Sequence, residues 1–217
     1  MQLYKHFEYT LKAHDKIPLI SIVPTLLYRL LSEDEGVNFL KNFAIIWVGG
    51  AALNDQLRLK SIKLGLRIAP CYGSTETSSM VAALNPDEFL RGKKGCGKAL
   101  SEVQLRIDLN NILRIKTPTL AKQCWKNGKR ISLIDETGWW KSGDLALIND
   151  QDNQHLEIIG RNDNAINIGG ETIFPEELEA KLIRQSLKMG INIKHVLFLA
   201  KKDSEWGNRM ICLFKLE

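Results

Sequence analysis

Three short apolar runs alternate with amphipathic stretches early in this chain, and that alternation limits the fold more than any other feature. The runs span residues 19–23, 43–48 and 66–69. One amphipathic helix is predicted after the first run, with Thr25 as its N-cap, and another over residues 54–64. Strands that alternate with helices through short loops are typical of a parallel sheet with crossover helices. We therefore predict an α/β fold whose parallel strands end at a common edge.

A different pattern begins near residue 95. Short alternating runs are separated by turn residues such as Asn127-Gly128, which indicates antiparallel hairpins. These runs span residues 103–107, 112–116, 144–148 and 155–159.

The tail after Arg161 mixes both patterns. Residues 166–168 predict a short strand, and Pro175, with acidic residues after it, begins a helix. The buried face of this helix is predicted at Leu178, Leu182, Ile183 and Leu187. Two further strands are predicted at residues 196–199 and 210–216.

Polar residues at 161–164 mark the best candidate for a domain boundary. We expect residues 1–161 to form one domain, which consists of an α/β part (1–94) and a β-hairpin-rich subdomain (95–161). Residues 162–217 are expected to form a small α+β domain.

The composition is 44% hydrophobic and 25% charged, with a formal net charge of +5, as in an ordinary globular protein. It excludes a disordered tail, a collagen-like repeat and a disulfide-stapled miniprotein. No apolar run reaches the roughly 18 residues of a transmembrane helix. The N-terminus lacks the layout of a signal peptide, so we expect no transmembrane segment and a cytoplasmic location.

The basic cluster at residues 91–98 contains no aromatic side chain, which argues against a nucleic-acid partner. A solvated loop and a loop beside an anionic ligand both remain open for it. The cysteines form no CxxC pair, and no histidine lies at metal-ligand spacing from them. Reduced, inert thiols are therefore expected rather than a zinc site.

The most informative motif follows the third apolar run, where ligands of parallel sheets bind. Residues 72–79 place five hydroxyl side chains around the single carboxylate of Glu76. Hydroxyl and backbone N–H groups suit phosphate oxygens, and a carboxylate among them suits a Mg²⁺ ion that bridges phosphates. Tyr72 offers an aromatic face to a base, and Gly73 permits close approach of a ligand. A plain Ser/Thr-rich loop with a capping Glu76 is the alternative.

Three other positions could serve the same ligand. Gly49-Gly50 follows the second run and either admits a flat ligand or simply turns the chain. Asp144 follows a glycine turn at the start of a predicted strand, and it either accepts bonds from ribose hydroxyls or caps its own backbone. Arg161 supplies a fixed positive charge, or belongs to a surface turn. The two loops at neighbouring strand ends together predict a crevice.

Taken in order, these motifs resemble those of the adenylate-forming acyl-CoA synthetase superfamily over residues 19–210. The matching segments are 72–77, 92–100 (Gly-x-x-Gly-x-Gly-Lys-x-Leu), 142–145, 160–163 and 169–179. Some segments are most similar to the o-succinylbenzoate–CoA ligases of menaquinone and phylloquinone synthesis. These are residues 22–27, 48–53, 72–81 and 85–89.

The resemblance implies an AMP-forming acid–CoA ligase with o-succinylbenzoate as the expected acid. In such enzymes ATP and the acid form an acyl-adenylate and pyrophosphate, and CoA then displaces AMP. Carried over by position, Thr75 contacts phosphate and Glu76 holds Mg²⁺, while Asp144 binds the ribose hydroxyls with Arg161 assisting.

The remaining roles implied by the resemblance concern adenine, CoA and domain motion. Residues 1–161 correspond to the distal part of an N-terminal adenylation domain, and residues 162–217 to part of a mobile C-terminal domain. Asp163 matches the hinge between these domains. Adenine is framed by Gly49, Gly50 and Tyr72, and the pantetheine of CoA passes Gly169 and Gly170. Ala51 and Gly73 are also expected to bind the cofactor.

Two family elements find no match, the Ser/Thr/Gly-rich phosphate loop ending in Lys and the adenylation lysine near the C-terminus. The chain is therefore expected to be shortened at both ends, to bind an acyl-adenylate analogue weakly and to adenylate slowly. Alternatives are another aryl- or fatty-acyl-CoA synthetase, or a non-catalytic truncated or split nucleotide-binding fragment. The sequence leaves open which acid is used, whether this chain alone is active, and its oligomeric state.

Overall fold

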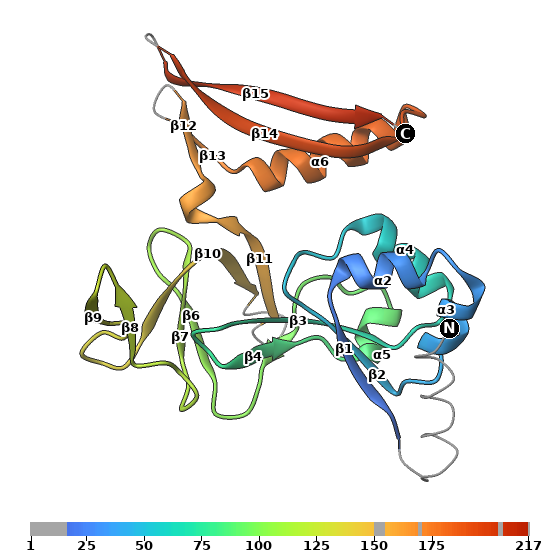
Figure 1. The fold of residues 1–217 in the computed structure, drawn as a ribbon, viewed down its shortest axis with the longest axis horizontal. Helices are drawn as coiled ribbons and strands as arrows, with labels where there is room; N and C mark the ends of the chain where they lie inside the picture. Colours follow the sequence, from blue (N-terminus) through green and yellow to red (C-terminus); the bar gives the residue numbers. More distant parts are fainter. Residues whose placement is uncertain (1–16, 150–154, 169–170, 204–205, 217) are drawn as a thin grey trace. The chain divides into compact units, whose positions relative to one another are not determined.

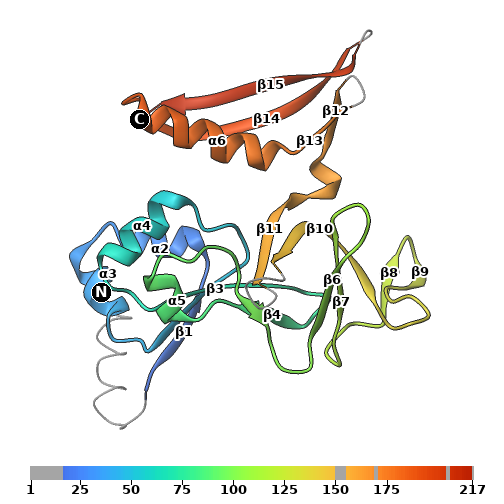
Figure 2. The ribbon, with the colours of Figure 1, turned by 180° about the vertical axis from the view of Figure 1, so that it is seen from behind.

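A computed structural model of the chain describes residues 17–149, 155–168, 171–203 and 206–216 (Figures 1 and 2). The described residues divide into two compact units. The first lies within residues 1–104, 116–133 and 149–157, and the second within 105–115, 134–148 and 158–217. Each unit therefore combines segments that are far apart in the sequence.

A five-stranded sheet forms the centre of the first unit. Its strands, in spatial order, are β1 (Leu19–Ile22), β2 (Ile45–Val48), β3 (Ile68–Ser74), β4 (Ser79–Ala83) and β5 (Lys98–Ala99). The first three run parallel, with Ile46 paired to both Ile20 and Ile68, whereas β4 and β5 are antiparallel to their neighbours. The parallel arrangement predicted for the three apolar runs is confirmed.

Four helices lie among the described residues of this unit: α2 (Pro24–Leu30), α3 (Asp34–Leu40), α4 (Asp55–Lys63) and α5 (Pro86–Leu90). Helix α4 begins where predicted because Asn54 Oδ1 accepts a hydrogen bond from Leu57 N at 2.8 Å. The predicted N-cap at Thr25 is wrong. Val23 occupies that position, because Pro24 lacks an N–H group and suits the first helical turn.

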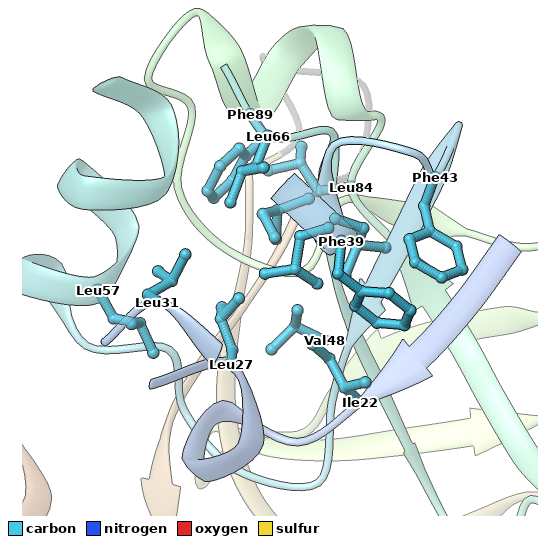
Figure 3. Close-up of a cluster of buried hydrophobic side chains, with 13 residues drawn as sticks. Ile22, Leu27, Leu31, Phe39, Phe43, Val48, Leu57, Leu66, Leu84 and Phe89 are labelled. Carbon is cyan, nitrogen blue, oxygen red and sulfur yellow. The ribbon is translucent and has the colours of Figure 1, made fainter. Parts of the chain in front are cut away.

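Apolar side chains of the strands and helices meet in one core (Figure 3). Leu27 of α2, Leu40 of α3, Ile46, Ile68 and Phe89 of α5 are all 0% exposed. Full burial of such a side chain stabilises the folded state by about 1.5–3 kcal/mol. The core therefore fixes the helices against the sheet whose strand ends carry the candidate site.

Strand β3 is longer than predicted, and β4 was not predicted at all. Tyr72, Gly73 and Ser74 lie within β3 rather than in a loop after it. Ser79 of β4 pairs with Ser74 in an antiparallel register. The hydroxyl-rich motif is therefore a β-hairpin, whose turn at residues 75–78 we call the hydroxyl turn.

The predicted antiparallel hairpins are confirmed after residue 95. A sheet in the order β11-β10-β7-β6 lies mostly in the second unit. Its strands are β6 (Gln104–Ile107), β7 (Ile112–Lys116), β10 (Trp140–Asn149) and β11 (His155–Arg161). In the first unit, β8 (Gln123–Lys126) and β9 (Lys129–Ser132) form a two-stranded sheet through the predicted Asn127-Gly128 turn, whose φ angles are 52° and 73°.

The C-terminal part of the second unit is α+β, as predicted. Its elements are η2 (Asn162–Asn164), β12 (Ile166–Ile168), β13 (Glu171–Ile173), α6 (Pro175–Lys188), β14 (Ile193–Asp203) and β15 (Gly207–Leu216). Strands β12 and β13 form one antiparallel pair, and β14 and β15 form another.

Helix α6 begins at Pro175 as predicted, and its predicted buried face is largely right. Leu178, Leu182 and Ile183 are half-buried. Leu187 is 40% exposed, against the prediction, because it lies about 100° around the helix from the buried Ser186. None of the helices in the described part of the chain has the length and apolar content that crossing a bilayer requires.

Candidate functional site

The carboxyl ends of β1, β2 and β3 meet at one edge of the first unit's sheet. Gly49 N donates a hydrogen bond to Ile22 O at 3.3 Å, which joins the ends of β1 and β2. A Cβ atom on Gly49 would lie 2.8 Å from Cys71 Sγ of β3, so a larger residue would displace that side chain. Gly50 has a φ of +81°, which favours glycine. The glycine pair therefore lets the three strand ends approach closely.

The hydroxyl turn is fixed by the buried side chain of Thr77, which is 1% exposed. Thr77 Oγ1 accepts a hydrogen bond from Ser74 N at 2.9 Å and donates to Ser79 O at 2.7 Å. A Cβ atom on Gly73 would collide with the backbone carbonyl of Ser79. The side chain of Thr77 thus bridges the two strands beside Gly73, where their backbones are too close for a larger residue.

A second set of hydrogen bonds comes from the segment before β8. Ser78 Oγ donates to Thr119 O at 2.8 Å, and Thr119 Oγ1 donates to Thr77 O at 3.0 Å. Ala121 N donates to Glu76 O at 2.8 Å. Sequence analysis missed Thr119 and Ala121, because no local pattern signals a contact across more than 40 residues.

Thr75 and Glu76 lie on this fixed turn with their side chains unengaged. Thr75 is exposed and Glu76 is half-buried. Within the described residues, neither side chain forms a hydrogen bond or an ion pair. The alternative in which Glu76 serves as a capping residue is therefore not supported, and its carboxylate is available to a ligand or ion.

In the second unit, the Arg161 guanidinium lies between two carboxylates. Its Nε and Nη2 each donate to the Asp163 carboxylate at 2.8 Å, while Nη1 donates to Asp144 Oδ1 at 3.4 Å. Hydrogen bonds from Arg161 hold the pKa of Asp163 below its ordinary value. In turn, the hydrogen bonds to Asp163 and the charge of Asp144 raise the pKa of Arg161 above its ordinary value. We call these three residues the Arg161 cluster.

Asp144 was predicted to begin a strand. It lies instead in the middle of β10. The pairing of β10 with β7 is irregular between Lys141 and Leu145. Ser142 Oγ accepts a hydrogen bond from Asp144 N at 3.1 Å within this irregularity. A Cβ atom on Gly143 would lie 2.5 Å from Arg161 Nη2, so glycine here makes room for the guanidinium instead of turning the chain.

The basic cluster at residues 91–98 is an ordered loop whose lysines are partly paired. Lys93 Nζ lies 2.9 Å from Glu88 Oε1, and Lys94 Nζ lies 3.1 Å from Asp55 Oδ1. Cys96 N donates to Leu156 O at 2.8 Å, and the buried His155 ring bonds to Lys94 O. These contacts favour the structural interpretation of the cluster over an anion site.

The four cysteine thiols differ in how far they are buried. Burial raises the pKa of Cys96 to about 12 and also raises that of Cys71, so both thiols are protonated at neutral pH. Cys212 on β15 is exposed, and Cys124 on β8 is half-buried. The expected inertness of the thiols thus has a physical basis at Cys71 and Cys96.

The structure brings the expected site residues together in two groups. Gly49, Gly50, Tyr72, Gly73, Thr75 and Glu76 belong to the first unit, where Ala51 is exposed beyond Gly50. Asp144, Arg161 and Asp163 belong to the second. Gly169 and Gly170 lie outside the described residues.

Comparison with known proteins identifies the family. The model of the AMP-binding enzyme family matches residues 6–114, which are half of the chain. This chain belongs to the AMP-binding enzyme family. The matched segment contains the hydroxyl turn and the glycine pair, so the first group of site residues lies within the part of the chain that matches the family.

Among AMP-binding enzymes, 2-succinylbenzoate–CoA ligases resemble the chain over nearly its whole length. The Escherichia coli K12 enzyme is 30% identical over 197 residues, which cover 91% of this chain and 40% of that protein. The Haemophilus influenzae enzyme is 32% identical over 197 residues, covering 89% and 40%. A solved variant of E. coli MenE with bound OSB-AMS is 30% identical, with a TM-score of 0.71 over 91% of this chain and 40% of that one.

These matches confirm the resemblance to o-succinylbenzoate–CoA ligases and the α/β adenylation-type fold. The chain spans about 40% of the length of the relatives it matches.

Proposed function

We propose that this chain functions as an AMP-forming acid–CoA ligase. Its acid substrate is o-succinylbenzoate, and it acts in menaquinone or phylloquinone synthesis in the cytoplasm. In the first step, a carboxylate oxygen of the acid attacks the α-phosphorus of ATP, and pyrophosphate leaves. In the second step, the CoA thiolate attacks the acyl carbonyl, and AMP leaves. Both steps require dispersed negative charge to be stabilised and the reactants to be aligned.

The observation that carries this proposal is the hydroxyl turn, whose backbone is fixed while Thr75 and Glu76 have unengaged side chains. Thr75 Oγ1 would donate to a phosphate oxygen. A Mg²⁺ ion is held by one or two carboxylates together with substrate phosphates, so the half-buried Glu76 fits it. When bound, the ion would neutralise phosphate charge.

The remaining proposed roles concern the ribose and the adenine, and each is assigned within one unit. Asp144 would accept hydrogen bonds from the ribose hydroxyls, and Arg161, which bonds to Asp144 Oδ1, would orient that carboxylate. Small residues permit close approach of a flat ring, so adenine would lie against Gly49, Gly50, Ala51, Tyr72 and Gly73.

The CoA half-reaction would involve the C-terminal part of the chain. We assign residues 1–161 to the adenylation domain and residues 162–217 to a mobile domain, with Asp163 as the hinge. The bidentate pair of Asp163 with Arg161 lies at that boundary. The pantetheine of CoA would pass Gly169 and Gly170.

Ligand-induced thermal stabilisation tests the proposal. A non-hydrolysable o-succinylbenzoyl-sulfamoyl-adenosine at about one hundred times its Kd stabilises a binding protein by about 2.7 kcal/mol, which raises Tm by about 5–10 °C for a chain of this size. A fatty-acyl analogue should raise Tm less. A larger shift with the fatty-acyl analogue would assign the chain to another acyl-CoA synthetase class, and no shift with either would contradict the nucleotide site.

A matched pair of variants tests the metal assignment. Glu76→Gln should weaken the stabilisation by ATP with Mg²⁺ while leaving the shift without Mg²⁺ nearly unchanged. Glu136→Gln, which alters an exposed carboxylate outside both groups, should change neither shift. Equal behaviour of the two variants would remove Glu76 from the metal site.

A further inference from the structure

One stretch of the chain accounts for its entire net positive charge. Residues 109–134 contain six Lys or Arg and no Asp or Glu, whereas the rest of the chain contains 24 basic and 25 acidic residues. Four of the six lie on or beside strands β8 and β9, and we call residues 122–132 the basic hairpin. These four cations are Lys122, Lys126, Lys129 and Arg130.

The basic hairpin places like charges against each other. Strands β8 and β9 form a sheet of their own (Figures 1 and 2), in which Lys126 is paired directly with Lys129. Like charges directly opposite each other destabilise a hairpin. All four cations are exposed, and none forms an ion pair with the described residues. Within the described residues, no acidic side chain neutralises these four charges, so they are available to an anionic partner.

Trp125 gives the basic hairpin an apolar anchor. Its side chain is 71% exposed, and Ile131 on the partner strand is 42% exposed. Arg130 is paired with Trp125 across the strands, and its guanidinium lies 5.7 Å from the centre of the indole ring. Indole rings flanked by cations are typical of the boundary between lipid headgroups and acyl chains.

We infer that the basic hairpin binds the surface of a membrane that contains anionic phospholipids. The four cations would contact headgroup phosphates while Trp125 enters the headgroup boundary. A single aromatic side chain favours this partner over single-stranded nucleic acid, whose binding surfaces stack successive bases on several aromatics. The cytoplasmic leaflet carries the negative surface potential that attracts such clusters.

The position of the basic hairpin connects this surface to the candidate site. Thr119 and Ala121, just before β8, donate the hydrogen bonds that hold the backbone of Thr77 and Glu76. A hairpin docked on lipid would thus keep the hydroxyl turn of the same unit close to the membrane surface.

Sedimentation of the full 217-residue chain with vesicles tests the inference. The chain should bind vesicles of phosphatidylcholine with phosphatidylglycerol, bind vesicles of phosphatidylcholine alone far less, and dissociate as salt is raised. Each cation near such a surface contributes about a fivefold increase in the partition coefficient, so Lys126→Gln/Lys129→Gln should lower it about 25-fold. The control Lys41→Gln/Lys63→Gln changes two exposed lysines elsewhere in the same unit, which form no ion pair with the described residues, and should bind as the parent does.

Quenching by brominated lipids tests the anchor separately. Trp125→Phe should keep most of the binding but lose most of the quenching, whereas Trp206→Phe, at another exposed tryptophan, should retain it. Binding that is equal on neutral vesicles, or unchanged in the double lysine variant, would overturn the inference. Tighter binding to a single-stranded oligonucleotide than to vesicles at the same salt would overturn it as well.

Discussion

The hydroxyl turn and the Arg161 cluster hold their candidate ligand-binding groups in opposite ways. In the hydroxyl turn the backbone is fixed by Thr77, Ser78 and Thr119, and the candidate side chains of Thr75 and Glu76 are unengaged among the described residues. In the Arg161 cluster the side chains themselves form ion pairs. The side chain of Asp163 is 64% exposed, and that of Arg161 is 48% exposed. A ligand at the first group would meet unengaged side chains, whereas a ligand at the second would compete with existing ion pairs.

The largest effect is expected at the narrow point of the hydroxyl turn. Gly73→Ala places a Cβ atom against the Ser79 carbonyl, which belongs to the backbone and has little room to move. We expect a loss of about 3 kcal/mol in the free energy of unfolding, measured by urea denaturation. Gly49→Ala, whose Cβ would meet only the Cys71 side chain, should cost less. Equal losses would show that the turn is less rigid than its hydrogen bonds indicate.

A smaller loss of stability is expected at Thr77, and a neighbouring threonine in the same turn should affect ligand binding instead. Thr77→Val removes a buried hydroxyl and leaves Ser74 N and Ser79 O without their partner, at a cost of about 2 kcal/mol. Thr75→Val changes an exposed hydroxyl without a partner in the described residues, so stability should change by less than about 0.5 kcal/mol. Thr75→Val should instead lower ATP affinity, measured by titration calorimetry, and an unchanged affinity would remove Thr75 from the phosphate site.

The smallest effect is expected in the Arg161 cluster. Asp163→Asn removes an exposed bidentate pair, so its cost at neutral pH should stay below about 1 kcal/mol and shrink with added salt. Because the pKa of Asp163 is lowered in the folded state, the pair stabilises the fold above the ordinary pKa of aspartate. That contribution is lost as pH falls through the lowered pKa. Urea denaturation of both proteins from neutral to acidic pH should show their difference vanish, and a constant difference would contradict the assignment.

Much of the fold could be predicted because local patterns and tertiary contacts agree. The apolar runs became β1, β2 and β3, Asn54 caps its helix, and Asn127-Gly128 forms the expected tight turn. Strand β4 escaped prediction because it begins among the serines of the hydroxyl motif, where no alternation of apolar residues marks a strand. Short helices such as α3 depend on packing into the core rather than on a long periodic pattern.

The candidate site could be predicted by residue type but not by how it is held. The motif at residues 72–79 indicated phosphate chemistry, yet nothing in it signals the hydrogen bonds from Thr119 and Ala121. Gly143 favoured a turn, but the structure uses it to admit the Arg161 guanidinium into an irregular strand. The assigned roles of Thr75, Glu76 and Asp144 in nucleotide binding stay predictions until the variants are measured.

The contrast among the thiols provides a route to spectroscopy. Because Cys71 and Cys96 are held in the protonated form, maleimide reagents at neutral pH should react first with the exposed Cys212. A fluorophore attached there reports from β15 of the second unit, whereas the hydroxyl turn belongs to the first. The natural Cys212 side chain thus provides a labelling position for following the hairpin of β14 and β15 while nucleotide is added.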